Sequence, residues 1–328
     1  MIPFLLFGCD KGGYDVDVSA IDLEIELVRF EDQLFALSGE SYENDYQKIY
    51  ESDPLITEAV VEQILGAGLA SNPRYSLLKR FTGDTALLQV VKDVQAKYND
   101  VGFIKQELNK AFKHVKYHFP NDTMPVKAYT LVTGFAGPGF TYEGVLGISL
   151  DWYMGADYKY YHPQMMPRYM QRRMTPDYIV PQVVKGYFTN KYPSNSNTDG
   201  TLLSEMIYYG KMLEYTKMAM PQLPDSIIIE YTAKNLKWCE MNEVQIFSHF
   251  VEEKLWYSTE QSQTSKYLTD GPYTVAGEIG RGSAPRFGWW VGWNIVRNYL
   301  KNEGMDDLEG FYSNTDAKDI FKKSKYKP

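Results

Sequence analysis

The segment that constrains the chain most reads Gly280-Arg281-Gly282-Ser283-Ala284-Pro285-Arg286-Phe287-Gly288-Trp289-Trp290-Val291-Gly292-Trp293. Its fourteen positions hold two arginines, four glycines and three tryptophans. A helix is expected over residues 285–302, and Gly288 and Gly292 then lie four residues apart on one face. Because glycine carries no side chain, we expect this face to let another backbone approach closely.

Most of the rest of the chain also has the apolar spacing and the capping residues of helices. In the C-terminal half, further helices are expected at about 175–190, 199–217, 232–253 and 315–324. In the N-terminal half, they are expected at about 30–37, 54–69, 84–98 and 103–117, the second of them starting behind Asp53-Pro54 as N-cap and first helical residue.

Three stretches predict strands. Residues 16–30 alternate apolar and polar positions, and residues 126–132 and 141–150 follow. The glycine-rich connection at 134–140 favours a hairpin with a wide loop between the last two. The predicted fold class is α+β, predominantly helical, with a small antiparallel sheet packed with helices. Residues 1–15 are expected to be a signal remnant and tether, and residues 16–328 a single α+β domain whose helical half begins near 155.

Composition excludes several functional classes. The 328 residues include 34 Lys and Arg against 42 Asp and Glu, a net charge of −8, which argues against nucleic-acid binding. No apolar run reaches the roughly 18–20 residues that cross a bilayer.

His114 and His118 share a helix face, but the pair is typical of a helix C-terminus, so we expect neither a metal nor another cofactor.

One helix has the outline of a zinc-peptidase motif without its ligands. In such a motif two histidines lie four residues apart and a glutamate follows the first. Here Ser204 and Tyr208 occupy the histidine positions and Glu205 the position of the general base. Neutral hydroxyls are poor zinc donors, so hydrolysis by a metal-bound hydroxide is not expected. Glu243 follows Glu205 by 38 residues, a distance at which some zincins place a third ligand.

These positions and the tryptophan-rich segment together suggest a binding groove. Arg281 and Arg286 are expected to pair with Glu205 or Glu243, or to bind an anionic group. The aromatic side chains either stack on a sugar or pack in the core. The groove residues predicted from the sequence are Glu205, Tyr208, Lys211, Trp238, Asn242, Glu243, Arg281, Arg286 and Trp289.

The first residues indicate a lipoprotein signal. An apolar run from Ile2 to Phe7 precedes Gly8 and Cys9, with Leu6 three residues before the cysteine. A small residue before the cysteine lets a signal peptidase reach the bond, and the thiol then accepts the lipid. The run is shorter than a usual signal core and lacks a basic region. The alternative is a buried N-terminal strand with a chance cysteine.

Several stretches resemble the gliding-motility-associated lipoprotein GldB of the Bacteroidota. They are Leu6-Phe7-Gly8-Cys9, Val28-Arg29-Phe30-Glu31, Gly147-Ile148-Ser149-Leu150-Asp151-Trp152-Tyr153-Met154-Gly155, Met206-Ile207-Tyr208-Tyr209-Gly210-Lys211, Lys237-Trp238-Cys239-Glu240-Met241-Asn242-Glu243, Val291-Gly292-Trp293-Asn294-Ile295-Val296-Arg297-Asn298-Tyr299 and Ile320-Phe321-Lys322-Lys323-Ser324-Lys325-Tyr326-Lys327-Pro328. The resemblance implies lipidation at Cys9 and a place in the cell envelope, in bacteria where gliding and type IX secretion share machinery. It also implies a fold similar to zincin peptidases without established catalytic activity.

Three functional hypotheses remain. The first is a non-enzymatic accessory lipoprotein, held to the membrane by its N-terminal lipid, whose groove binds an envelope protein or peptidoglycan. The second is a hydrolase of envelope peptide or glycan that uses Glu205 and Glu243, since two carboxylates roughly 5–10 Å apart can cleave a glycosidic bond. The third is a carbohydrate-binding module built on the surplus of Tyr and Trp. We favour the first, because the metal ligands are missing and no catalytic triad can be assembled.

Overall fold

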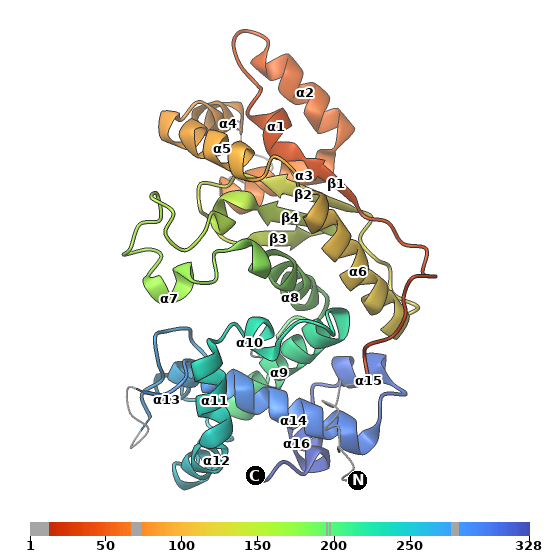
Figure 1. Ribbon diagram of the computed structural model, residues 1–328, viewed down its shortest axis with the longest axis vertical. Helices are drawn as coiled ribbons and strands as arrows, with labels where there is room; N and C mark the ends of the chain where they lie inside the picture. The colour runs from red at the N-terminus through yellow and green to blue at the C-terminus, as the bar shows by residue number, and fades with distance from the viewer. Residues whose placement is uncertain (1–12, 67–73, 195, 197, 277–281) are drawn as a thin grey trace, which may run out of the picture. The chain divides into compact units, whose positions relative to one another are not determined.

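The computed structural model describes residues 13–66, 74–194, 196, 198–276 and 282–328. Contacts divide the chain into two compact units, each discontinuous in sequence. The sheet unit comprises Leu23–Asn109 and Thr123–Pro193, and the helical unit comprises Met1–Asp22, Lys110–Asp122 and Ser194–Pro328. The predicted class, α+β and predominantly helical, is confirmed (Figure 1). The single domain expected after residue 15 stays a prediction.

The sheet unit is built on four strands in the order β1-β2-β4-β3. The strands are β1 Glu26–Arg29, β2 Lys127–Leu131, β3 Gly139–Tyr142 and β4 Val145–Ser149. The helices of this unit are α1 Phe30–Leu34, α2 Tyr42–Ser52, α3 Pro54–Ala59 continued by a π-helical turn Val60–Ile64, α4 Arg74–Thr82, α5 Thr85–Lys97, the first half of α6 Gly102–His118, a 3₁₀ turn Leu150–Tyr153, α7 Arg168–Gln171, a 3₁₀ turn Pro176–Tyr178 and α8 Ile179–Lys191.

The sheet is mixed, so the prediction of an antiparallel sheet is wrong. β1 pairs parallel with β2, and β2 pairs parallel with β4. β3 and β4 pair antiparallel, and they are joined through Glu143 and Gly144 at φ 45° and 84°. Two consecutive residues of positive φ suit a two-residue hairpin turn, because its twist matches that of the strands. The hairpin is therefore formed by β3 and β4. The hairpin expected between residues 126–132 and 141–150 is wrong, because β2 and β4 in these ranges pair parallel.

Strand β4 lies between β2 and β3 in the sheet. Every residue of β4 is buried, which requires cover on both faces of the sheet. Helices α3 and α8 both pack against β3 and β4. Asp53 and Pro54 are the N-cap and the first residue of α3, as predicted. The Asp53 side chain makes no capping hydrogen bond; its Oδ1 accepts hydrogen bonds from Lys127 Nζ and Tyr129 OH on β2, at 2.9 and 2.8 Å. The predicted strand from 16 to 30 is confirmed only at Glu26–Arg29.

The helical unit is centred on two long helices, α9 Leu202–Ala219 and α14 Phe287–Glu303, which pack directly against each other. The other elements are α10 Asp225–Ile228, α11 Ala233–Met241, α12 Glu243–Glu252, α13 Gln261–Thr264, a 3₁₀ turn Ser265–Tyr267, α15 Leu308–Ser313, α16 Ala317–Ser324 and the second half of α6. The helix expected at 232–253 is thus two helices joined at Asn242. None of the described helices is long and apolar enough to span a membrane.

Glycines let α9 and α14 approach, as the spacing of Gly288 and Gly292 predicts. A Cβ at Gly292 would overlap the carbonyl oxygen of Met206 on α9. A Cβ at Gly210 on α9 would in turn overlap the backbone of Gly292. Because glycine has no side chain, these positions let the two backbones come into direct contact. Of the predicted groove residues, Glu205, Tyr208 and Lys211 lie on α9 and Trp289 lies on α14.

Candidate functional site

Arg286, one of the predicted groove residues, is buried at the start of α14. Its backbone adopts the left-handed conformation at φ 38°, and its side chain is only 2% exposed. The guanidinium donates to Glu230 Oε2 and to the carbonyl oxygen of Ile229, each at 3.1 Å, and its Nε lies 3.4 Å from Asp270 Oδ1. The expected pairing with Glu205 or Glu243 is wrong, because two acidic residues from loops already neutralise this charge.

Trp289 joins Arg286 to the aromatic face of α9. The ring of Tyr209 stacks on Trp289 with centroids 4.2 Å apart and 13° between the planes. The guanidinium carbon of Arg286 lies 4.0 Å from the centroid of Trp289, a cation–π distance. Tyr208 contacts Tyr209 edge-on at 5.4 Å. Trp289 and Tyr208, both predicted, therefore belong to one cluster, which Tyr209 completes.

Glu205 lies at the edge of this aromatic cluster. Its carboxylate accepts a hydrogen bond from Ser194 Oγ at 3.1 Å. Burial raises the pKa of Glu205, with a further contribution from Asp199, and the hydrogen bond opposes the rise. Burial also raises the pKa of Tyr208 to about 12, to which Tyr209 and Glu205 contribute. Glu205 is thus a half-buried acid beside two tyrosines.

Lys211 makes a structural contact elsewhere in the helical unit. Its Nζ donates to the carbonyl oxygens of Phe311 and Asn314, each at 2.6 Å, and lies 3.4 Å from that of Tyr312. These carbonyls belong to the C-terminal end of α15, where cations are favourable. Burial lowers the pKa of Lys211 to about 7. Lys211 therefore caps α15.

Asn242 and Glu243 form a third set of contacts at the joint of α11 and α12. Asn242 Nδ2 donates to the carbonyl oxygen of Trp238 at 2.7 Å, which stabilises the end of α11. Glu243 Oε1 accepts from Asn294 Nδ2 at 3.3 Å and from Tyr326 OH at 3.0 Å. Trp238 itself packs on the ring of Phe287 at 6.1 Å.

The predicted groove is therefore divided among separate sets of contacts. In the part of the chain that the structure describes, no hydrogen bond or ion pair links Glu205 with Glu243. Nor do the described residues contain a group of three or more His, Cys, Asp or Glu that could hold a metal ion. Arg281 and Cys9, the remaining predicted residues, lie outside the described residues.

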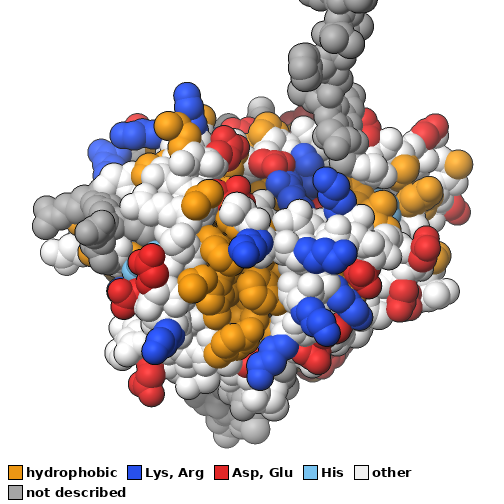
Figure 2. Space-filling model, turned by 90° about the horizontal axis from the view of Figure 1, so that it is seen from below, with side chains coloured by type: hydrophobic (Ala, Val, Ile, Leu, Met, Phe, Trp, Pro, Cys, Tyr) orange, Lys and Arg blue, Asp and Glu red, His pale blue; other side chains and the backbone are white. Residues whose placement is uncertain are grey.

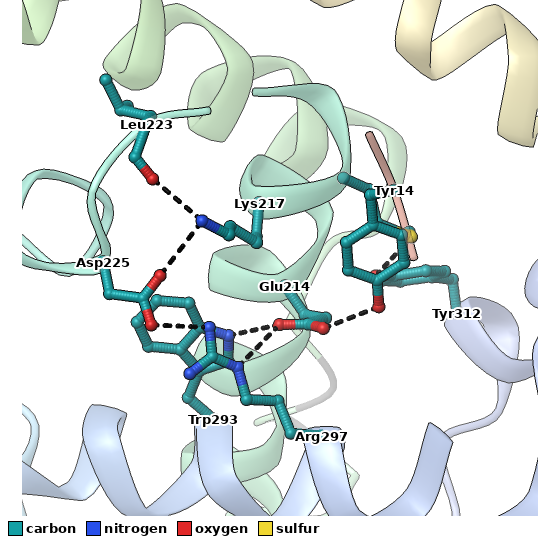
Figure 3. A network of polar contacts seen from close by, with 9 residues as sticks. Tyr14, Glu214, Lys217, Leu223, Asp225, Trp293, Arg297 and Tyr312 are labelled. Carbon is teal, nitrogen blue, oxygen red and sulfur yellow. Dashed lines mark hydrogen bonds and ion pairs between the residues drawn. The ribbon is translucent and has the colours of Figure 1, made fainter. Parts of the chain in front are cut away.

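A buried network that sequence reasoning missed is centred on Glu214 of α9 (Figure 3). Its carboxylate accepts hydrogen bonds from Tyr14 OH at 2.7 Å, Trp293 Nε1 at 2.5 Å and Arg297 Nε at 3.2 Å. Arg297 also pairs with Asp225 at 2.9 Å. Burial opposes the charge of Arg297, but the carboxylates of Glu214 and Asp225 outweigh it and raise the pKa. Glu214 lies three residues from Lys211 and from Lys217, a spacing that is typical of an ordinary polar helix face, so the sequence gives no specific signal for the network.

The sheet unit contains a separate cavity of about 590 Å³, a volume typical of ligand pockets. Apolar side chains from the π-helical turn, α4 and α5 make most of its wall, and the charged side chains of Arg80 and Asp84 also line it. The apolar wall includes Leu65, Leu77, Phe81, Leu87, Val90 and Phe135. None of these positions was predicted to be functional, because the residues come from four segments that approach only in the fold.

Asp151 holds the loop that closes one side of this cavity. Gly134 and Phe135 line the cavity and both have positive φ, 69° and 65°. The fully buried carboxylate of Asp151 accepts hydrogen bonds from the backbone N–H groups of Thr133 at 3.1 Å and Phe135 at 2.7 Å. Burial raises the pKa of Asp151 to about 6, although these N–H groups favour its charged form. The hydrogen bond from Phe135 N–H to the buried Asp151 carboxylate thus offsets the strain of the left-handed backbone at Phe135.

Comparison with known proteins identifies the family. The model of the family described as gliding motility protein GldB matches residues 11–328, essentially the whole chain, which confirms the resemblance seen in the sequence. No curated protein and no solved structure matches the chain significantly. The expected similarity to zincin peptidases therefore stays a prediction.

Proposed function

Since the chain belongs to the family of the gliding motility protein GldB, we propose that it is a lipid-anchored, non-enzymatic adaptor of the gliding machinery in the cell envelope. The lipid is attached to Cys9, and the folded part binds another protein of the envelope. In bacteria that couple gliding to type IX secretion, this partner belongs to their shared apparatus.

The anchoring proposal is supported by the residues that follow Cys9. Tyr14, five residues further on, is 6% exposed and donates to the buried carboxylate of Glu214. Its ring also meets that of His118 edge-on at 5.6 Å. A lipid on Cys9 would therefore be connected to the helical unit through a tether of only a few residues.

The observation that carries the adaptor proposal is the cavity of the sheet unit. Its apolar wall suits one or two large hydrophobic side chains of a partner, and Arg80 and Asp84 suit polar groups next to them. By contrast, Lys211, Glu243 and Arg286 of the predicted groove are all engaged in contacts within the fold. We therefore place the partner at the cavity.

Filling the cavity tests this proposal without removing a contact. Ala86 on α5 lines the cavity and is exposed, whereas Lys92 on the same helix is exposed and does not line it. We expect Ala86→Trp to abolish surface gliding at an unchanged amount of membrane-bound protein, and Lys92→Trp to leave gliding intact. Normal gliding of cells that carry Ala86→Trp would exclude the cavity as the docking site.

Anchoring is tested separately by fractionation. We expect Cys9→Ser to move the chain from the membrane fraction to the soluble fraction, and metabolic labelling with a fatty acid to mark the wild type alone. A Cys9→Ser protein that is still labelled would exclude lipidation at this residue.

A further inference from the structure

The C-terminal segment, residues 317–328, has a charge opposite to that of the whole chain. Its twelve residues contain five lysines and one aspartate, whereas the full chain has a net charge of −8. Lys323 pairs with Asp319 at 2.9 Å. Lys322, Lys325 and Lys327 are exposed, and no ion pair engages them in the described part of the chain. The segment therefore presents uncompensated positive charge.

This segment is held firmly in the helical unit. Ile320 and Tyr326 are buried, and the hydroxyl of Tyr326 donates to Glu243. Asn302 Nδ2 on α14 donates to the carbonyl oxygens of Lys323 and Ser324 at 3.1 and 2.9 Å. The exposed lysines are thus displayed by a fixed backbone rather than by a loose tail.

An exposed apolar stripe on α12 lies beside these lysines. Val244, Phe247 and Val251 are spaced for one helix face, and the two valines are 62% and 51% exposed. Phe247 contacts the ring of Tyr326 at 5.9 Å, which joins the stripe to the C-terminal segment. Figure 2, in which the molecule is seen from below, shows an apolar area on this face with both basic and acidic side chains around it.

The tether reaches the helical unit close to the same place. Gly13 lies beside Met305, since a Cβ on Gly13 would be 3.9 Å from Met305 Cε. Met305 follows the end of α14, three residues after Asn302, which holds the C-terminal segment. Gly13 is the fourth residue after Cys9, and an extended chain spans at most about 14 Å over that interval. A lipid on Cys9 would therefore bring the membrane surface close to these lysines.

From these contacts we propose that Lys322, Lys325 and Lys327, together with the stripe Val244–Phe247–Val251, bind the surface of a membrane that contains anionic phospholipids. Lysines provide attraction to phosphate head groups, and the apolar side chains enter the boundary between head groups and acyl chains. The benefit to the cell rests on the lipid anchor proposed above, because a single lipid chain gives only reversible attachment and a basic surface supplies the second contact.

Vesicle binding by the Cys9→Ser protein tests this surface independently of lipidation. We expect the full-length variant to co-sediment with vesicles of phosphatidylglycerol and phosphatidylcholine at low salt, and not with vesicles of phosphatidylcholine alone. Since each lysine near an anionic surface contributes about fivefold to partitioning, changing Lys322, Lys325 and Lys327 to Glu should lower binding at least 100-fold. The matched control changes the exposed residues Lys48, Lys79 and Lys92 of the sheet unit to Glu, with the same total charge, and should bind like Cys9→Ser.

Two further measurements separate the parts of this surface. The double variant Val244→Asn, Val251→Asn should bind the vesicles more weakly, with the salt dependence of binding unchanged. Addition of 10 mM inorganic phosphate should not displace the protein from the vesicles, because the proposed ligand is the membrane surface and not free phosphate. Equal binding by both triple variants, or binding to phosphatidylcholine alone, would overturn the proposal. Such a result would leave the Cys9 anchor standing, because fractionation tests it separately.

Discussion

Gly292 on α14 lies directly against the carbonyl oxygen of Met206 on α9, with no space for a side chain between the two backbones. This contact holds together the two longest helices of the helical unit. The residues of the aromatic cluster and of the Glu214 network all project from this pair or from segments that contact it.

Gly292→Ala should therefore be severely destabilising. The new Cβ would overlap backbone, which cannot move as a flexible side chain can, so we expect a loss of about 4 kcal/mol or more in the free energy of unfolding. Gly282→Ala is the control, because no atom lies within 4 Å of the corresponding Cβ. Urea denaturation followed by circular dichroism measures both. Similar midpoints for the two variants would contradict the close approach.

Tyr14→Phe should loosen the tether without disturbing the helices. The substitution removes the hydroxyl that donates to Glu214 and leaves that carboxylate one partner short, at a cost of about 1–3 kcal/mol. Tyr117→Phe is the control, since Tyr117 is 50% exposed. We expect a lower urea midpoint and faster proteolytic removal of the first residues in Tyr14→Phe only. Unchanged proteolysis would show that Tyr14 does not hold the tether.

Asp151 should make stability depend on pH between about 4 and 6. Burial raises its pKa from 3.8 to about 6, so the folded state binds the proton more tightly than the unfolded state. The stabilisation from this group is complete below pH 3.8 and is lost as the pH rises through 6. The shift corresponds to about 3 kcal/mol. Asp151→Asn cannot titrate and should remove this dependence.

The measurement for Asp151 is urea denaturation at several pH values. The free energy of unfolding of the wild type minus that of Asp151→Asn should decrease from pH 4 to 6 and stay constant above 7. Asp306→Asn, the same substitution at an exposed position, is the control. A difference for Asp151→Asn that is independent of pH would refute the raised pKa.

Glu205→Gln should leave gliding unchanged. In the described structure Glu205 contacts Ser194, and no contact brings it to the second glutamate that a hydrolytic pair requires. We expect a change in stability below about 1 kcal/mol, because the amide oxygen still accepts from Ser194. Loss of gliding by a stable, membrane-bound Glu205→Gln protein would favour the hydrolase hypothesis instead.

The candidate site was only partly predictable from the sequence. Helical spacing placed Gly288 and Gly292 on one packed face, because this pattern follows from 3.6 residues per turn. The stacking of Tyr209 on Trp289, which brings α9 and α14 together in one aromatic cluster, is a tertiary contact. The spacing could not reveal that Lys211 caps α15 or that Arg286 pairs with Glu230 and Asp270. Each of those partners comes from another element, and the direction of a side chain depends on what the fold brings opposite to it.

The sequence by itself determined the family, the helical character of both halves and the approximate ends of α5, α6, α9 and α14, because these depend on local spacing, capping residues and glycines. Tertiary structure alone decided the order of the strands, the parallel pairing of β2 with β4 and the cavity beside Phe135. Strand pairing and cavities join segments far apart in the chain, so their energies depend on the packing of the whole unit rather than on any one stretch of residues.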